Sequence, residues 1–220
     1  MIRAIRQPLA ALALMAAGVT AAEATPLPPN LSFDVVRGGE SIGTHKVEFR
    51  RDGDNLTVDI AIDLTVRLAF IPVFRYTHRN TEVWRDGKLV RLDSTTDDDG
   101  TKYRVSAEAT AEGLKVTDAE GRSYIAPPDT VPTSYWNAAL LERNELLNTQ
   151  DGTLMPISVE SRQGSADGAT HFHLIKGEDA TPIDVWYDAR GKNWSKLRFI
   201  ARGSTIDYRR LAPSQQQAFD

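Results

Sequence analysis

The stretch Thr57-Val58-Asp59-Ile60-Ala61-Ile62-Asp63-Leu64-Thr65-Val66-Arg67-Leu68 alternates polar and apolar side chains from end to end. Successive side chains of a β-strand point to opposite faces, so this alternation predicts one long strand with an apolar face and a solvated face. A helix would spread the same apolar residues around its circumference. The chain therefore contains at least one sheet that covers an apolar core.

Turn signals separate this strand from its neighbours on both sides. Asp-Gly and Gly-Gly pairs supply the positive φ angles that tight hairpins need, and they recur along the first half of the chain, at Gly38-Gly39, Asp86-Gly87 and Asp99-Gly100. Further alternating segments are expected at 155–160, 170–176, 182–188, 194–201 and 205–211. The pattern predicts a mainly β protein with a large curved antiparallel sheet, or a barrel or spiral, of about 12 strands.

One segment has a different period. Thr133 and Ser134 follow Pro132 and are good residues for a helix start. Apolar and amphipathic side chains then recur at helical spacing, at Trp136, Ala139, Leu140, Arg143 and Leu147. This spacing predicts one central amphipathic helix over 134–147, placed to plug or cap the curved sheet.

The N-terminus has the features of a secretory signal peptide. Arg3 and Arg6 precede an apolar run over residues 9–19, and small residues follow at 22–24. The run is too short and too rich in alanine for a stable membrane anchor. We therefore expect a signal peptide over 1–24, a single β-rich domain over 25–212, a flexible tail over 213–220, and export to the periplasm of a Gram-negative bacterium.

Composition excludes several classes of function. The chain has a formal net charge of −4 and no cysteine. The negative charge disfavours nucleic acid as a partner, and the absence of cysteine excludes disulfides, thiolate metal sites and a lipoprotein anchor. No glycine-rich phosphate loop or nucleophile elbow is present, so no catalytic residue is assigned and the chain is interpreted as non-enzymatic.

Three segments resemble a known family. The opening Phe33-Asp34-Val35-Val36-Arg37-Gly38-Gly39, the central Ser134-Tyr135-Trp136-Asn137, and the hairpin around Asp184-Val185-Trp186-Tyr187 are similar to an uncharacterised family of exported bacterial proteins that carries a domain of unknown function. The likeness spans residues 31–211. More distantly, the chain is similar to envelope proteins built as curved half-barrels or spirals of strands, including lipoprotein carriers. The resemblance implies a fold and a compartment and assigns no catalytic residue.

The strand around residues 74–84 carries the candidate ligand site. Its alternate positions Tyr76, His78, Glu82 and Trp84 mix aromatic and polar groups on one face. Such a face suits a cavity in which a few polar groups orient an apolar guest, and it equally suits a solvated face with aromatic ends. If the sheet encloses a cavity, Tyr135 and Trp136 of the central segment are expected to line it as well.

His171 and His173 form the candidate metal site. Two residues apart on a strand, they point the same way and could share a divalent metal if a third ligand came from elsewhere, for example from His45 or His78. An ordinary strand surface explains the same pair without a metal. No other cofactor is expected.

Three functions follow from these observations. The first is a periplasmic protein that binds an apolar or amphipathic ligand, such as a lipid, or an envelope protein, in the concavity of its sheet. The second is a metal-binding protein that uses His171 and His173. The third is a structural or interaction protein of the cell envelope whose sheet edge pairs with a partner.

Overall fold

The computed structural model describes residues 26–162, 168–176, 182–190 and 193–212, and the strands within them form one antiparallel sheet. The first eight strands are β1 (Leu31–Arg37), β2 (Glu40–Asp52), β3 (Asn55–Leu68), β4 (Ile71–Arg85), β5 (Lys88–Asp98), β6 (Thr101–Ala109), β7 (Leu114–Thr117) and β8 (Ser123–Ala126), and tight turns join β1 to β6. After a crossing segment come β9 (Glu145–Leu147), β10 (Leu154–Arg162), β11 (Thr170–Lys176), β12 (Ile183–Tyr187), β13 (Trp194–Ala201) and β14 (Ser204–Arg210). The sequence-based expectation of a mainly β, antiparallel fold is confirmed, with 14 strands in place of about 12.

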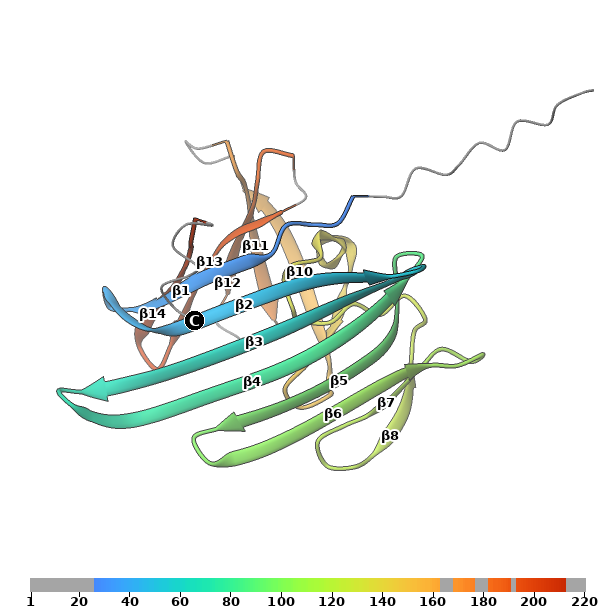
Figure 1. Ribbon diagram of the computed structural model, residues 1–220, viewed down its shortest axis with the longest axis horizontal. Coiled ribbons are helices and arrows are strands. Elements are labelled where there is room, and N and C mark those ends of the chain that lie inside the picture. The colour runs from blue at the N-terminus through green and yellow to red at the C-terminus, as the bar shows by residue number, and fades with distance from the viewer. Residues whose placement is uncertain (1–25, 163–167, 177–181, 191–192, 213–220) are drawn as a thin grey trace, which may run out of the picture.

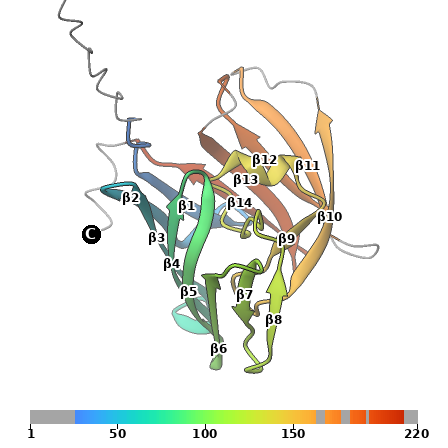
Figure 2. The same ribbon diagram turned by 90° about the vertical axis from the view of Figure 1, so that its right-hand side faces the viewer.

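The strand order explains the curvature. The order is β8-β7-β6-β5-β4-β3-β2-β1-β14-β13-β12-β11-β10-β9, so the two halves of the chain join where β1 pairs with β14. At this seam Val35 lies opposite Tyr208. The terminal strands β8 and β9 are not paired with each other within the described residues, so the sheet stays open. Figures 1 and 2 show its halves facing each other across a concavity.

The core fills one end of this concavity. β3 carries the alternation that the sequence predicted, and Val58 and Ile60 are buried on the inner face while Leu68, at the other end of the strand, is 73% exposed. Opposite them lie buried residues of β12 and β13, including Val185, Trp194 and Leu197. Burial therefore decreases along β3 towards its C-terminal end, which leaves room for a cavity there.

The helix predicted over 134–147 is wrong. The segment holds a single 3₁₀ turn, Ala138–Glu142, and its last residues form strand β9. Tyr135 has a φ of +63°, which ends any right-handed helix at that point, and its carbonyl accepts a hydrogen bond from the Tyr187 hydroxyl at 2.7 Å. Tertiary contacts thus override the local helical spacing, and the segment crosses the concavity as a loop (Figure 2).

Gly43 allows β2 and β3 to approach closely inside the bend. Its φ is +143°, and a Cβ at this position would lie 1.9 Å from the carbonyl oxygen of Asp63. The register of β1 against β2 shifts opposite this glycine, between Val35 and Val36. A bulge of this kind increases the local twist, which helps the long strands to curl around the cavity.

In the part of the chain that the structure describes, no helix is long and apolar enough to cross a bilayer. The signal peptide expected over 1–24 and the flexible tail expected over 213–220 lie outside the described residues.

Candidate ligand-binding pocket

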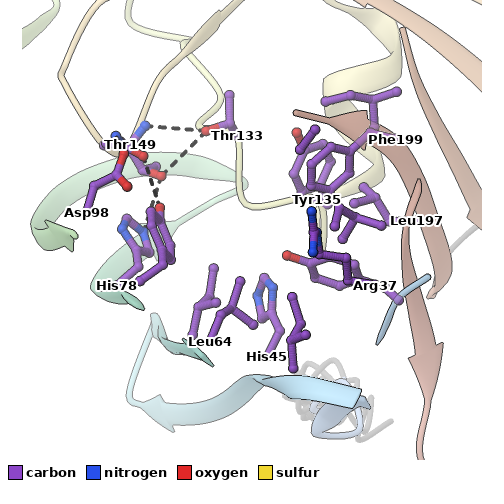
Figure 3. Close-up of a pocket in the computed structure, with 18 of the residues that line it drawn as sticks. Arg37, His45, Leu64, His78, Asp98, Thr133, Tyr135, Thr149, Leu197 and Phe199 are labelled. Atoms are coloured by element: carbon purple, nitrogen blue, oxygen red, sulfur yellow. Dashed lines mark hydrogen bonds between the residues drawn. The ribbon is translucent and has the colours of Figure 1, made fainter. Parts of the chain in front are cut away.

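A pocket of about 690 Å³ lies between the two halves of the sheet. One wall comes from β2, β3 and β4, and the facing wall comes from β12, β13 and β14. The crossing segment supplies Thr133, Ser134 and Tyr135, and the loop after β9 supplies Asn148, Thr149 and Gln150. Figure 3 shows His78 and Asp98 on one side and Leu197 and Phe199 on the other.

The registers arrange the first wall in rows across β2, β3 and β4. The row that joins Glu82 to Val58 belongs to the packed core beneath the pocket. The next three rows contain Ile60, Ile62 and Leu64 of β3, and they line the pocket itself. Because these side chains alternate with outward-facing ones, the apolar face of β3 becomes a wall of the pocket.

Glu82 is a buried carboxylate under the pocket floor. Its Oε2 accepts hydrogen bonds from the indole N–H groups of Trp84 and Trp136, both at 2.9 Å, and its Oε1 accepts one from the Asn80 amide at 2.9 Å. Burial raises the pKa of Glu82 above 4.5, although these hydrogen bonds and the nearby Ser134 hydroxyl oppose the rise. The carboxyl group therefore ties three aromatic and polar side chains into one network.

Two neutral histidines lie in the wall above Glu82. The His78 Nδ1 lies 2.8 Å from the Thr96 hydroxyl, its Nε2 lies 3.4 Å from the Thr149 hydroxyl, and burial lowers the His78 pKa to about 4. His45 is fully buried, and burial, with a smaller effect from His78, lowers its pKa to about 3. Both ring nitrogens of His45 lack a hydrogen-bond partner among the described residues, and its ring packs edge-on against Trp194 and Tyr208.

A polar chain borders the pocket on the side of β5. The Tyr76 hydroxyl donates to Gln150 Oε1 at 3.1 Å, and the Gln150 amide reaches Asp98 Oδ2 at 3.4 Å. Burial, followed by the nearby Asp98 charge, raises the pKa of Tyr76, so this hydroxyl stays protonated. The pocket thus combines apolar walls with a few placed polar groups, as ligand sites commonly do.

The predicted site residues fall into two sets. Tyr76, His78 and Tyr135 line the pocket. Glu82, Trp84 and Trp136 form the network beneath its floor, where Trp84 and Trp136 meet edge-to-face with ring centroids 5.4 Å apart. The structure therefore brings all six together, three as lining and three as support.

Sequence reasoning missed the opposite wall. Leu197, Phe199 and Ala201 line the pocket from β13, and Ile206 and Tyr208 do so from β14. The alternation within 194–201 and 205–211 could have shown which side chains share a face. It could not show that this face lies opposite β3, because that follows from the pairing of β1 with β14.

His171 and His173 lie away from the pocket. His171 Nε2 and His173 Nδ1 contact the same oxygen, Asp184 Oδ1, at 2.8 and 2.9 Å. Burial acts to raise the pKa of Asp184, but the bonds from His173 and His171 outweigh it and lower that pKa. The His171 ring also stacks on Trp186 at 4.3 Å between centroids. Among the described residues, no group of three or more His, Cys, Asp or Glu side chains is arranged to hold a metal ion.

We expect the His171→Ala, His173→Ala double variant to hold as much zinc as the unchanged protein, because both imidazoles are already bound to Asp184. Elemental analysis of the two proteins after dialysis against zinc makes the comparison. One equivalent of zinc per chain, lost in the double variant, would instead establish the metal site.

Comparison with protein families matches residues 33–211 to DUF6134, a domain of unknown function. The chain belongs to this family. The match begins at the third residue of β1 and ends just after β14, so the DUF6134 domain takes in nearly the whole curved sheet with its pocket. No curated protein matches the sequence.

The fold has a counterpart among solved structures. The chain is similar to the crystal structure of a beta-barrel-like protein of the domain of unknown function DUF1849 from Brucella abortus, with a TM-score of 0.58 and 11% sequence identity. The superposition covers 83% of this chain and 94% of the other. This likeness supports a barrel-like sheet, as the family resemblance implied.

Proposed function

We propose that this DUF6134 protein is a non-enzymatic binding protein whose pocket holds an apolar or amphipathic small molecule, such as a lipid. The observation that carries the proposal is the cavity of about 690 Å³ between the two sheet halves. Small-molecule sites commonly have volumes of about 300 to 1,000 Å³. The cavity therefore has the size of a ligand site and exceeds an ordinary packing void.

The walls fit an apolar guest. Ile62, Leu64 and Val66 face the cavity from β3, and Leu197 and Phe199 face it from β13. Burying a guest against these side chains would gain about 25 cal/mol for each Å² of apolar surface removed from water. Ile62, Leu64 and Phe199 are only partly buried, so each keeps apolar surface that a guest could cover.

The polar groups favour an uncharged guest at the inner end. His45 and His78 are neutral because burial lowers their pKa values to about 3 and about 4. The charged lining residues are Arg37, Asp98 and Arg202, and Asp98 lies on the His78 side of the pocket, opposite Tyr76 in the register of β4 against β5 (Figure 3). An amphipathic ligand would therefore place its apolar part against β3 and β13 and its charged part near those residues.

The titratable groups of the site have structural roles, which favours binding over catalysis. The Glu82 carboxylate is engaged by three N–H donors, and His78 is held between two threonine hydroxyls.

The features of residues 1–24 support a periplasmic location. An envelope protein as partner stays an alternative occupant of the concavity.

A tryptophan that fills the pocket tests the proposal. We expect native mass spectrometry of the protein isolated from a bacterial periplasm to show an adduct of lipid-like mass that organic solvent removes. Leu64→Trp should lower its occupancy about tenfold, because the larger ring occupies the space of the guest.

The matched control is Ile125→Trp, since Ile125 is 45% exposed on β8 and does not line the pocket. Its adduct should equal that of the unchanged protein. A bare chain mass in the unchanged protein, or an adduct that Leu64→Trp leaves intact, would contradict the proposal and favour an interaction protein.

A further inference from the structure

The β3–β4 hairpin projects beyond the strands beside it. The pairing of β2 with β3 ends at Leu64, and the pairing of β5 with β4 begins at Tyr76. Beyond these residues β3 and β4 pair with each other alone among the described strands, through to Leu68 opposite Ile71. We call residues 65–74 the β3–β4 tip, and Figure 1 shows it reaching past the neighbouring hairpins.

The β3–β4 tip is apolar and exposed. The exposed fractions are 73% for Leu68, 95% for Phe70, 69% for Ile71 and 52% for Val73. These four residues make up most of the large hydrophobic side chains that are exposed in the described part of the chain. Contiguous exposed apolar residues mark protein or membrane contact sites, whereas isolated ones need no explanation.

The turn at the end of this hairpin departs from the other hairpin turns of the sheet. Its central residues are Ala69 and Phe70, and Ala69 adopts a φ of +54° that costs a non-glycine residue free energy. The other tight turns among the described residues use glycine, at Gly38-Gly39, Gly53-Asp54, Asp86-Gly87, Asp99-Gly100 and Arg202-Gly203. This turn therefore lacks the glycine that the other tight turns use, and it exposes a phenyl ring.

The tip is continuous with the pocket. Val66, Val73 and Phe74 line the pocket, and Val73 is at the same time half exposed. The Arg202 guanidinium, from the β13–β14 turn, lies 4.7 Å from the centre of the Phe74 ring. This contact joins the two walls at the end of the pocket nearest the tip.

Arginines surround the apolar tip. Arg67 belongs to the tip and Arg75 follows it directly in the sequence, both side chains are exposed, and Arg202 adds a third guanidinium. In the neighbouring turn the Asp97 carboxylate accepts from the Gly100 N–H, and the Asp99 carboxylate accepts from the Arg75 N–H of β4. An apolar tip with arginines beside it matches the layers of an anionic lipid surface.

We propose that the β3–β4 tip docks this protein on an anionic lipid bilayer. Leu68, Phe70 and Ile71 enter the boundary between headgroups and acyl chains, and the three arginines lie at the depth of the phosphates. The mouth of the pocket then faces the bilayer, from which a lipid can enter. Pro72 favours a bilayer over an added protein strand, because it lacks the N–H that strand pairing uses. The proposal goes beyond the proposed function, since docking needs no loaded pocket.

Vesicle flotation tests the docking. The probes are vesicles of phosphatidylethanolamine mixed with phosphatidylglycerol, and vesicles of phosphatidylcholine alone. Every variant is exported by the same bacterial host and its N-terminus is verified by intact mass. We expect the Phe70→Asp, Ile71→Asp double variant to bind the anionic vesicles at least about tenfold more weakly than the unchanged protein, because both charges would lie in the apolar boundary layer.

Two further variants make the result specific. Ile125→Asp introduces the same charge at an exposed isoleucine on β8 and should bind like the unchanged protein. Arg67→Gln, Arg75→Gln should lose about 25-fold on anionic vesicles, about fivefold for each arginine, and should not change binding to phosphatidylcholine. Circular dichroism and thermal unfolding verify that each variant is folded.

Equal vesicle binding by the tip variant and the unchanged protein would overturn the proposal, and so would an unchanged protein that ignores both kinds of vesicle. A dimer that depends on Phe70, without vesicle binding, would assign the tip to a second copy of the chain and also overturn it. The pocket adduct reports separately on the proposed function, because Phe70 and Ile71 do not line the pocket.

Discussion

Replacing Glu82 with alanine is expected to lower the free energy of unfolding by about 3 to 5 kcal/mol. The substitution removes the shared acceptor of the Trp84 and Trp136 indoles and of the Asn80 amide, each bound at 2.9 Å. Glu82 is fully buried, so water does not replace the lost acceptor. Each donor left without a partner in such a site costs about 1 to 3 kcal/mol.

Glu82→Gln is the matched control and should stay within about 1 kcal/mol of the unchanged protein. The glutamine oxygen can accept from both indoles. Its amide can donate to Asn80 Oδ1, which has no partner in the structure, once the Asn80 amide turns over. Denaturant unfolding at constant pH compares the three proteins, and an alanine variant as stable as the glutamine variant would contradict the role assigned to the carboxylate.

The pH dependence gives a second measure of the same network. Burial raises the pKa of Glu82 in the folded protein above 4.5, so the folded chain retains a proton that the unfolded chain releases. The resulting stability is fully present below pH 4.5 and is lost as the pH rises through the folded pKa. The glutamine variant cannot titrate and should lack this loss.

The second large effect is acid destabilisation through the pocket histidines. Their pKa values fall from 6.5 to about 3 for His45 and to about 4 for His78 on folding. Folded-state pKa values below the unfolded one mean that stability is present above pH 6.5 and is lost as the pH falls. At pH 4 each histidine should have removed about 3 kcal/mol of stability, so the two together would remove about 6 kcal/mol, which lies at the lower end of the stability of an ordinary domain.

His45→Leu separates this effect from general acid unfolding. The substitution keeps a similar volume in the aromatic enclosure and removes two nitrogens that have no partner. The drop in unfolding free energy from pH 7 to pH 4 should be about 3 kcal/mol smaller in the variant than in the unchanged protein. Parallel pH profiles for the two proteins would show that His45 is not the group responsible.

Local patterns predicted the strands well because one face of each strand meets the core. The alternation of residues 57–68 became β3, and the mixed face of Tyr76, His78, Glu82 and Trp84 became the inner face of β4. The chemistry of that face suggested a cavity. Its division into a lining and a supporting network depends on the Trp136 indole reaching Glu82, across 54 residues of sequence.

The incorrect helix prediction has the same cause, since a local pattern does not show contacts between residues that are far apart in sequence. Helical spacing around Leu140 is a local signal, whereas Tyr135 is held at a positive φ by contacts from distant strands. Leu147 of β9 pairs with Leu154 of β10, so its burial comes from the sheet. The second wall of the pocket was missed for a related reason, since no short pattern shows that β13 faces β3.

The seam between β1 and β14 also bears on how the protein folds. Phe33 pairs with Arg210, so two of the most distant described segments must meet before the two halves become one sheet. Contacts between residues so far apart in sequence form slowly, because a long loop must close first. During synthesis the apolar face of the N-terminal half therefore stays uncovered until the last strand has been made. The pocket is among the last features to form, and a chaperone that shields β3 in the meantime should raise the yield of folded protein.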